Sequence, residues 1–317
     1  MSTRHLPSLL VLLLASGLVA CASIPPPRET GMLVFWRIVR ADGTGGSAHL
    51  LGSMHVAKQP LSLDPAIDAA LAAADELVLE VAPEELGSAA VQELIFERGR
   101  LPEGKTFAEL VSPSTFKAVE KRFEKRHLPI ADWLGWEPWV VSLALASDRL
   151  EHEGFSRAEG VERKLTADAL NARKKTRGLE TTREQIERLD ALPIATQELL
   201  LRDAVIEGKR AAPVDTLEAA WLRGDLAALA REIFASPTGP DAEAFFEAVY
   251  FARNRDFADD IARLIDAGGR WFVAIGAGHM VGDQGIPQLL VARGLRVERV
   301  AKTRSLPGRS TEQEPAK

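Results

Sequence analysis

The pattern of hydrophobic and polar positions divides the chain into strand-like ends and a helix-like middle. Residues 32–39 and 48–52 are short apolar runs around a turn-rich Asp-Gly-Thr-Gly-Gly, which is typical of a β-hairpin. Near the other end, 271–275 and 295–300 are also strand-like, and 285–293 between them has helical spacing. We therefore expect strands from both ends of the chain.

The region between these ends begins with one further strand and then becomes helical. Residues 64–74 form an alanine-rich helical pattern, and residues 76–81 are an apolar run typical of a buried βαβ strand. From 88 to 266 the spacing is mainly helical, and Thr181 with Glu184 forms a capping box. This order predicts an α/β fold with a large helical middle region.

The same short unit occurs near each end of the chain. In each unit a glycine ends an apolar strand and a histidine follows three residues later: Gly52 and His55 in the first, Gly276 and His279 in the second. Each unit then continues into a helix and a strand. Open α/β sheets bind ligands beyond the carboxyl ends of their strands. We expect a single domain over 32–301, in which a mixed sheet brings the two histidines together.

The amino terminus has the pattern of an export signal. The apolar run of residues 9–14 is too short for an ordinary transmembrane helix, and it leads to Leu-Val-Ala followed by Cys21, which resembles a lipoprotein processing site. We expect a signal peptide over 1–20 and a lipidated, proline-rich tether over 21–31. The alternative is a plain signal peptide with an accidental cysteine.

The expected location follows from this anchor. Ser23 is not the aspartate that retains lipoproteins in the inner membrane, so that sorting rule favours the outer membrane, facing the periplasm. No later segment has a long apolar run without charges, so we expect a protein that is anchored and does not span the membrane. The polar tail, 302–317, is expected to be disordered.

Composition excludes several classes of protein. The chain has 317 residues, of which 46% are hydrophobic and 26% charged, as is usual for a globular protein. A net charge of -6 argues against a nucleic-acid binder. The single cysteine excludes an intramolecular disulfide and a cysteine-rich zinc module.

The paired histidines predict a divalent metal site. Two imidazoles, one carboxylate and open positions suit catalytic Mn, Co, Fe or Zn. The carboxylate candidates are Glu80, Glu180, Asp283 and Glu298. Glu80 is the strongest because it lies in a nearly apolar strand, although a strand-end residue can also point to solvent.

Three further residues, Asp283, Arg253 and Asn254, are candidates for supporting roles. Asp283 follows His279 by four residues, and it could cap the next helix or orient the imidazole. Arg253 and Asn254 could supply an anion clamp or an oxyanion donor. A solvated helix start is the alternative for this pair.

These residues belong to a set of motifs that resembles a known family. The motifs are Gly52-Ser53-Met54-His55, Glu80, Trp136-Glu137-Pro138-Trp139, Gly178-Leu179-Glu180-Thr181 with Glu184-Gln185, Trp221-Leu222-Arg223-Gly224-Asp225, Arg253-Asn254 and Gly276-Ala277-Gly278-His279. Over about residues 32–300 the chain resembles the TraB/GumN family, which includes the pheromone-shutdown proteins and is similar to the Tiki metalloproteases.

The resemblance implies a fold related to the erythromycin-esterase and ChaN-like superfamily. It also implies a metal-dependent peptidase site that contains the paired histidines and a glutamate. The chain departs from the family pattern at Glu162, where many relatives have aspartate after Gly-Val. The resemblance therefore assigns no role to Glu162.

The leading functional hypothesis is a metal-dependent hydrolase of peptide or amide bonds. In it His55 and His279 bind the metal, and Glu80 is a ligand or the general base. Glu80→Gln is then expected to abolish turnover without affecting folding. The alternatives are a protein that binds and sequesters a peptide without cleaving it, and a haem carrier.

Overall fold

The computed structural model describes residues 30–205, 214–234 and 240–303. The predicted signal peptide, Cys21, most of the tether and nearly all of the tail lie outside the described residues. In the described part, no helix is long and apolar enough to cross a membrane.

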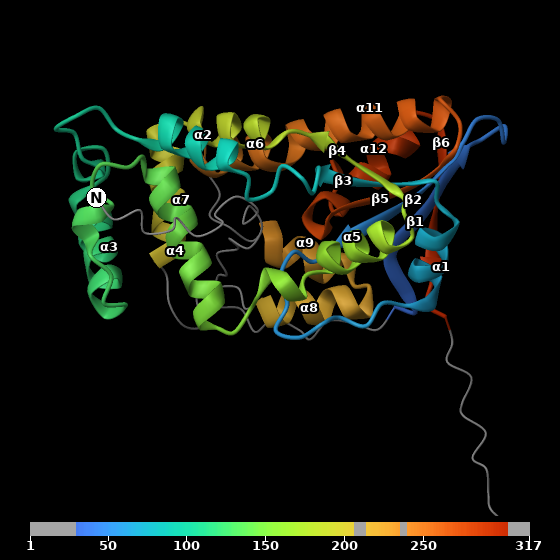
Figure 1. Ribbon diagram of the computed structural model, residues 1–317, viewed down its shortest axis with the longest axis horizontal. Coiled ribbons are helices and arrows are strands. Elements are labelled where there is room, and N and C mark those ends of the chain that lie inside the picture. Colours follow the sequence, from blue (N-terminus) through green and yellow to red (C-terminus); the bar gives the residue numbers. More distant parts are fainter. Residues whose placement is uncertain (1–29, 206–213, 235–239, 304–317) are drawn as a thin grey trace, which may run out of the picture.

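A six-stranded mixed sheet uses both ends of the described chain (Figure 1). The strands are β1 (Met32–Arg40), β2 (Ser47–Ser53), β3 (Glu76–Val81), β4 (Lys175–Glu180), β5 (Arg270–Gly276) and β6 (Leu295–Ala301). Their spatial order is β4-β3-β5-β2-β1-β6, in which β1 pairs antiparallel with β2 and β6 and the other pairs are parallel. The predicted α/β fold is confirmed.

Helices cover both faces of the sheet and extend beyond one of its ends. The helices are α1 (Pro65–Ala73), α2 (Ala89–Gly99), α3 (Pro113–Lys125), α4 (Pro138–His152), α5 (Val161–Asn171), α6 (Thr182–Asp190), α7 (Ile194–Val205), α8 (Val214–Arg223), α9 (Leu226–Phe234), α10 (Pro240–Phe246), α11 (Ala252–Asp266) and α12 (Ile286–Ala292). In Figure 1, α11 and α12 lie on one face of the sheet and α1 and α5 on the other, while α3, α4 and α7 lie farthest from it.

Strand β4 is an element that the helical spacing of 88–266 did not predict. Its sequence, Lys-Thr-Arg-Gly-Leu-Glu, has a single large apolar residue and only its last residue is buried, which suits a strand at the edge of the sheet. Pairing with β3 organises it, and Arg177 forms an ion pair with Glu76 of that strand. The strand ends at Glu180, and it thereby places this carboxylate beside Arg253.

Local signals at helix ends were accurate to within one or two residues. The predicted capping box is present at the start of α6, where Thr181 and Glu184 bond reciprocally. Helix α3 is capped by Ser112 rather than by Ser114, which lies within its first turn.

Four parallel strands, β4, β3, β5 and β2, end at the same edge of the sheet. Ser53 of β2 is the register partner of Gly276 of β5, so the two Gly-x-x-His units start side by side as predicted. Gly52 allows this packing, since a Cβ there would lie 2.6 Å from Val34 Cγ1 and 2.7 Å from Met280 Cγ. The residues at and just after the ends of these four strands therefore lie along one edge of the sheet.

Candidate functional site

The loop after β2 holds His55 against the start of α5. Ala57 and Ser156 exchange two backbone hydrogen bonds, and the Val161 N–H donates to the Met54 carbonyl at 2.9 Å. Gly160 passes so close to the His55 carbonyl that a Cβ would collide with it. These contacts position the next residue of α5 beside the imidazole.

That residue is Glu162, and it forms an imidazole–carboxylate pair with His55. His55 Nδ1 lies 2.6 Å from Glu162 Oε1, which also accepts a hydrogen bond from the Ser53 hydroxyl. Burial alone would lower the pKa of His55, but the Glu162 carboxylate and, less strongly, Glu80 raise it above its usual value. Burial would raise the pKa of the Glu162 carboxyl, but His55 and Ser53 together hold that pKa below its usual range.

Glu80 lies between the two histidines. Its Oε1 accepts a hydrogen bond from the Gly276 N–H at 2.7 Å and lies 3.7 Å from His55 Nε2 and 4.0 Å from His279 Nε2. Burial would raise the pKa of Glu80, but Arg253, the two histidines and the Gly276 N–H lower it far below its usual value. Glu80 is therefore an ionised carboxylate and a weak base.

Arg253 is a buried cation whose donors are all used within the protein. Its Nη1 donates to the Val249 carbonyl at 2.9 Å and to His279 Nε2 at 3.1 Å, and its Nη2 donates to Glu80 Oε2 at 2.5 Å. Nε and Nη2 also donate to Glu180. A guanidinium has five N–H groups, so none remains for a substrate.

A π-helix presents Arg253 in this orientation. The π-helix η5 (Glu247–Phe251) runs directly into α11, and its Val249 carbonyl accepts one of the arginine's hydrogen bonds. Such widened turns recur at functional sites because they displace the following residues relative to an ordinary helix. Arg253 has 1% and Asn254 0% relative exposure, so the alternative of a solvated helix start is excluded.

Asn254 determines the protonation of His279. Its Nδ2 donates to the Gln284 carbonyl at 2.7 Å, so its Oδ1 faces His279 Nδ1 at 2.5 Å. His279 therefore carries its proton on Nδ1, and Nε2 accepts from Arg253. Burial, together with Arg253, lowers the pKa of His279 to about 3. The imidazole is neutral and does not act as an acid or a base near neutral pH.

The remaining candidate carboxylates lie in different surroundings. Glu180 is buried against Arg253, and burial raises its pKa despite that neighbour. Asp283 is exposed and fills neither of its two predicted roles. Gly285, not Asp283, is the N-cap of α12, and Asn254, not Asp283, orients the His279 imidazole. Glu298 is on the outer strand β6, where it pairs with Arg37 and Arg296.

The arrangement of His55, His279 and Glu80 does not match a centre in which all three bind one metal ion. Arg253 already donates to two of the three predicted ligands, His279 and Glu80, so a guanidinium lies where the cation was expected. Among the described residues, no group of three or more His, Cys, Asp or Glu side chains is arranged to hold a metal ion. The divalent-metal prediction itself stays a prediction.

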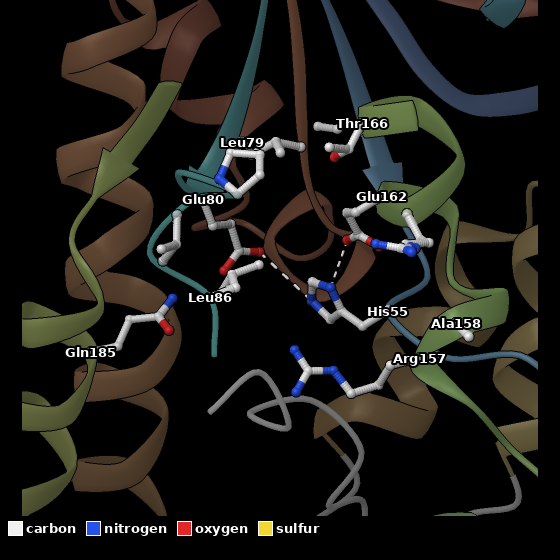
Figure 2. Close-up of a pocket in the computed structure, with 13 residues that line it drawn as sticks. His55, Leu79, Glu80, Leu86, Arg157, Ala158, Glu162, Thr166 and Gln185 are labelled. Atoms are coloured by element: carbon white, nitrogen blue, oxygen red, sulfur yellow. Dashed lines mark ion pairs between the residues drawn. The ribbon is translucent and has the colours of Figure 1, made fainter. Parts of the chain in front are cut away.

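A cavity of about 390 Å³ opens over His55, Glu80 and Glu162 (Figure 2). Leu79, Val81, Pro83 and Leu86 provide an apolar part of its lining. The polar part includes Arg157, Arg163, Thr166 and Gln185. Its volume is within the range of roughly 300–1,000 Å³ that is usual for small-molecule sites.

Glu162 is the functional candidate that sequence reasoning missed. The only signal was its position directly after Gly160-Val161, where many relatives of the resembled family carry aspartate. A longer carboxylate at this position still reaches the imidazole, as the 2.6 Å contact shows.

Comparison with models of protein families gives one finding. The model described as TraB/PrgY/gumN family matches residues 34–299. Comparisons with curated proteins and with solved structures give no match.

Proposed function

The chain belongs to the TraB/PrgY/gumN family, and from this premise we propose that it hydrolyses peptide or amide bonds by general acid–base catalysis. The observation that carries the proposal is a series of contacts in which Ser53 donates to Glu162 and Glu162 pairs with His55. The other nitrogen of this imidazole, His55 Nε2, lies at the cavity, 3.7 Å from Glu80 Oε1. A carboxylate on one imidazole nitrogen orients the other nitrogen as a base.

The 3.7 Å interval suits a water molecule that donates one hydrogen to His55 Nε2 and the other to Glu80 Oε1. Its lone pair then attacks the substrate carbonyl carbon while His55 takes the proton. Glu162 stabilises the imidazolium that forms, and the imidazolium gives its proton to the leaving nitrogen as the C–N bond breaks. Glu80 orients the water, since its low pKa makes it a weak base.

Arg253 and His279 act as a support in this mechanism. The buried guanidinium compensates the charges of Glu80 and Glu180 and holds Glu80 against the Gly276 N–H. Support of this kind fixes the reacting groups without touching the substrate.

The second candidate is a metal-dependent form of the same hydrolysis. It is favoured by the 3.7 Å separation of His55 Nε2 and Glu80 Oε1, which two ligands of one ion can span with bonds of about 2 Å. The acid–base mechanism of Glu162, His55 and Glu80 does not require a metal ion.

One experiment separates these candidates. The chain without residues 1–21 is assayed on a peptide library with and without a chelator, beside His55→Gln and the matched control His152→Gln at an exposed position. We expect cleavage that survives the chelator, falls by about 10²-fold or more in His55→Gln and is unchanged in His152→Gln. Loss with the chelator and recovery with metal would favour the second candidate. Peptide binding without cleavage would favour sequestration.

We also propose that the protein is an exported lipoprotein, anchored through Cys21 to the outer membrane and facing the periplasm. The support is the lipobox-like Leu-Val-Ala-Cys and the Ser23 that follows it. This location would give the site access to peptides of the periplasm.

A further inference from the structure

An exposed leucine lies at the cavity beside the reacting groups. Leu86 is 38% exposed, and it lines the cavity together with His55 and Glu80. Among the described residues that line this cavity, no other large hydrophobic side chain is as exposed. In the view of Figure 2 its side chain lies next to Glu80, with His55 across from both. Apolar surface at a binding site is removed from water when an apolar group of a ligand covers it, which favours such ligands.

The turn that carries Leu86 is held in place by two helix starts. Glu85 Oε2 accepts a hydrogen bond from the Thr182 N–H in the first turn of α6 at 2.8 Å. Ser88, two residues after Leu86, is the N-cap of α2. Within the turn the Leu86 N–H donates to the Pro83 carbonyl at 3.3 Å. Because caps of this kind satisfy the free N–H groups of a helix start, the position of Leu86 is fixed before a ligand binds.

The apolar lining of the cavity also reaches the reacting groups. Leu79 and Val81 flank Glu80 in β3, and all three line the cavity. A carbonyl group that is attacked beside His55 and Glu80 therefore has this lining and Leu86 next to it. A side chain on the adjoining residue meets apolar surface, and the Glu80 carboxylate disfavours an acidic side chain at the same place.

We propose that the site selects peptides or amides with an aliphatic side chain on a residue adjoining the bond that is hydrolysed, and that Leu86 recognises this side chain. The proposal rests on the proposed function in one respect: His55 and Glu80 place the bond. Leu86 determines specificity and takes no part in the chemistry. The aliphatic residue can lie on the acyl or on the amine side of the bond, and the probes distinguish the two.

Binding is measured by calorimetry with three neutral probes, which are acetyl-leucyl-glycinamide, acetyl-glycyl-leucinamide and acetyl-glycyl-glycinamide. The protein is the chain without residues 1–21, which keeps all the described residues, and it carries His55→Gln to suppress cleavage. We expect at least one leucyl probe to bind about tenfold or more tightly than the glycyl probe, the usual scale for apolar contacts in a pocket. The leucyl probe that binds more tightly identifies the side of the bond.

Variants then assign this preference to Leu86. Leu86→Asn keeps the size of the side chain but removes its apolar character, so the preference should fall by about threefold or more, whereas Leu86→Met should retain it. The matched control is Leu170→Asn, which changes a 58% exposed leucine of α5 outside the cavity lining and should leave the preference unchanged. Leu86→Ala gives the same test if Leu86→Asn does not fold. A merely structural Leu86 would change the affinity of all three probes by the same factor.

The outcomes separate this inference from the proposed function. A preference for a leucyl probe that depends on Leu86, without cleavage by the wild type, supports the inference and overturns the proposed hydrolysis. Equal binding of leucyl and glycyl probes, binding of none of them, or a preference that Leu86→Asn leaves unchanged overturns the inference. Cleavage of leucyl and glycyl probes by the wild type with equal kcat/KM also overturns it, and leaves the proposed hydrolysis standing.

Discussion

His55 and His279 share a sequence motif, yet their pKa values move in opposite directions. His55 faces two carboxylates, and together these outweigh burial and raise its pKa. His279 is completely buried beside the Arg253 guanidinium, and both effects lower its pKa, to about 3. The motif therefore supplies one imidazole whose protonated form is favoured by neighbouring carboxylates and one that serves as a fixed acceptor.

The first prediction concerns the pH dependence of His55. Glu162→Gln keeps a hydrogen-bond acceptor near Nδ1 but removes the negative charge, so the pKa of His55 should fall. A general base works when it is unprotonated, and the acid limb of kcat/KM should therefore move to lower pH. The plateau should fall about tenfold or more, because the imidazolium loses its counter-charge.

An NMR titration of the His55 ring checks this shift without a substrate. The control is Glu159→Gln. Glu159 lies in η3 (Arg157–Glu159) and does not belong to the His55–Glu162 pair, so this variant should leave the His55 titration unchanged. An unchanged His55 titration in Glu162→Gln would show that the pair does not set the pKa.

The second prediction concerns the buried cation. Arg253→Gln leaves Glu80 and Glu180 without their guanidinium in a buried site. Breaking a buried pair in this way should lower the free energy of unfolding by about 3–5 kcal/mol. Arg296→Gln removes an exposed arginine and should change it by less than about 0.5 kcal/mol. Denaturant titration of both variants measures the difference, and equal stabilities would contradict the structural role.

This network also changes the expectation for Glu80→Gln. The sequence alone predicts that the substitution spares folding. In the structure Glu80 accepts from both Arg253 and Gly276, so the variant should lose stability as well as activity. Activity of this variant must therefore be compared at equal fractions of folded protein.

At the scale of elements, short segments from distant parts of the chain position the site. The start of α5 places Glu162, the π-helix before α11 places Arg253, and the end of β4 places Glu180. Of these, helical spacing predicted most of α11 but neither the π-helix nor β4. A π-helix differs from an α-helix in backbone pairing rather than in apolar period, so the pattern of residues does not reveal it.

The third prediction tests the contact between the start of α5 and the loop after β2. Gly160→Ala would place a methyl group against the His55 carbonyl, and relieving that overlap should cost about 1–3 kcal/mol of stability. It should also move Glu162 away from His55 and lower activity. Gly135→Ala is the matched control, since its nearest neighbour is the flexible end of Arg100 at 3.4 Å. If Gly160→Ala behaves like Gly135→Ala, the close approach is not required.

At the scale of the whole molecule, the fourth prediction concerns the anchor, which lies outside the described residues. Cys21→Ala should move the protein from the membrane fraction to the soluble fraction, because the lipid on Cys21 is the proposed attachment. Mass spectrometry of the mature protein and fractionation of cells measure the two effects. An unmodified Cys21 in the wild type would contradict the lipoprotein proposal.

The sequence by itself determined the α/β class, the family and the pairing of two Gly-x-x-His units at the sheet edge. These depend on local signals, namely apolar period, glycine position and turn composition, each of which spans a few residues. The neighbours of those histidines were decided only by the tertiary structure. Ser53 and Glu162 are 109 residues apart, and Glu80 and Arg253 are 173 residues apart. Contacts over such distances depend on strand order and loop path, and no local period encodes them.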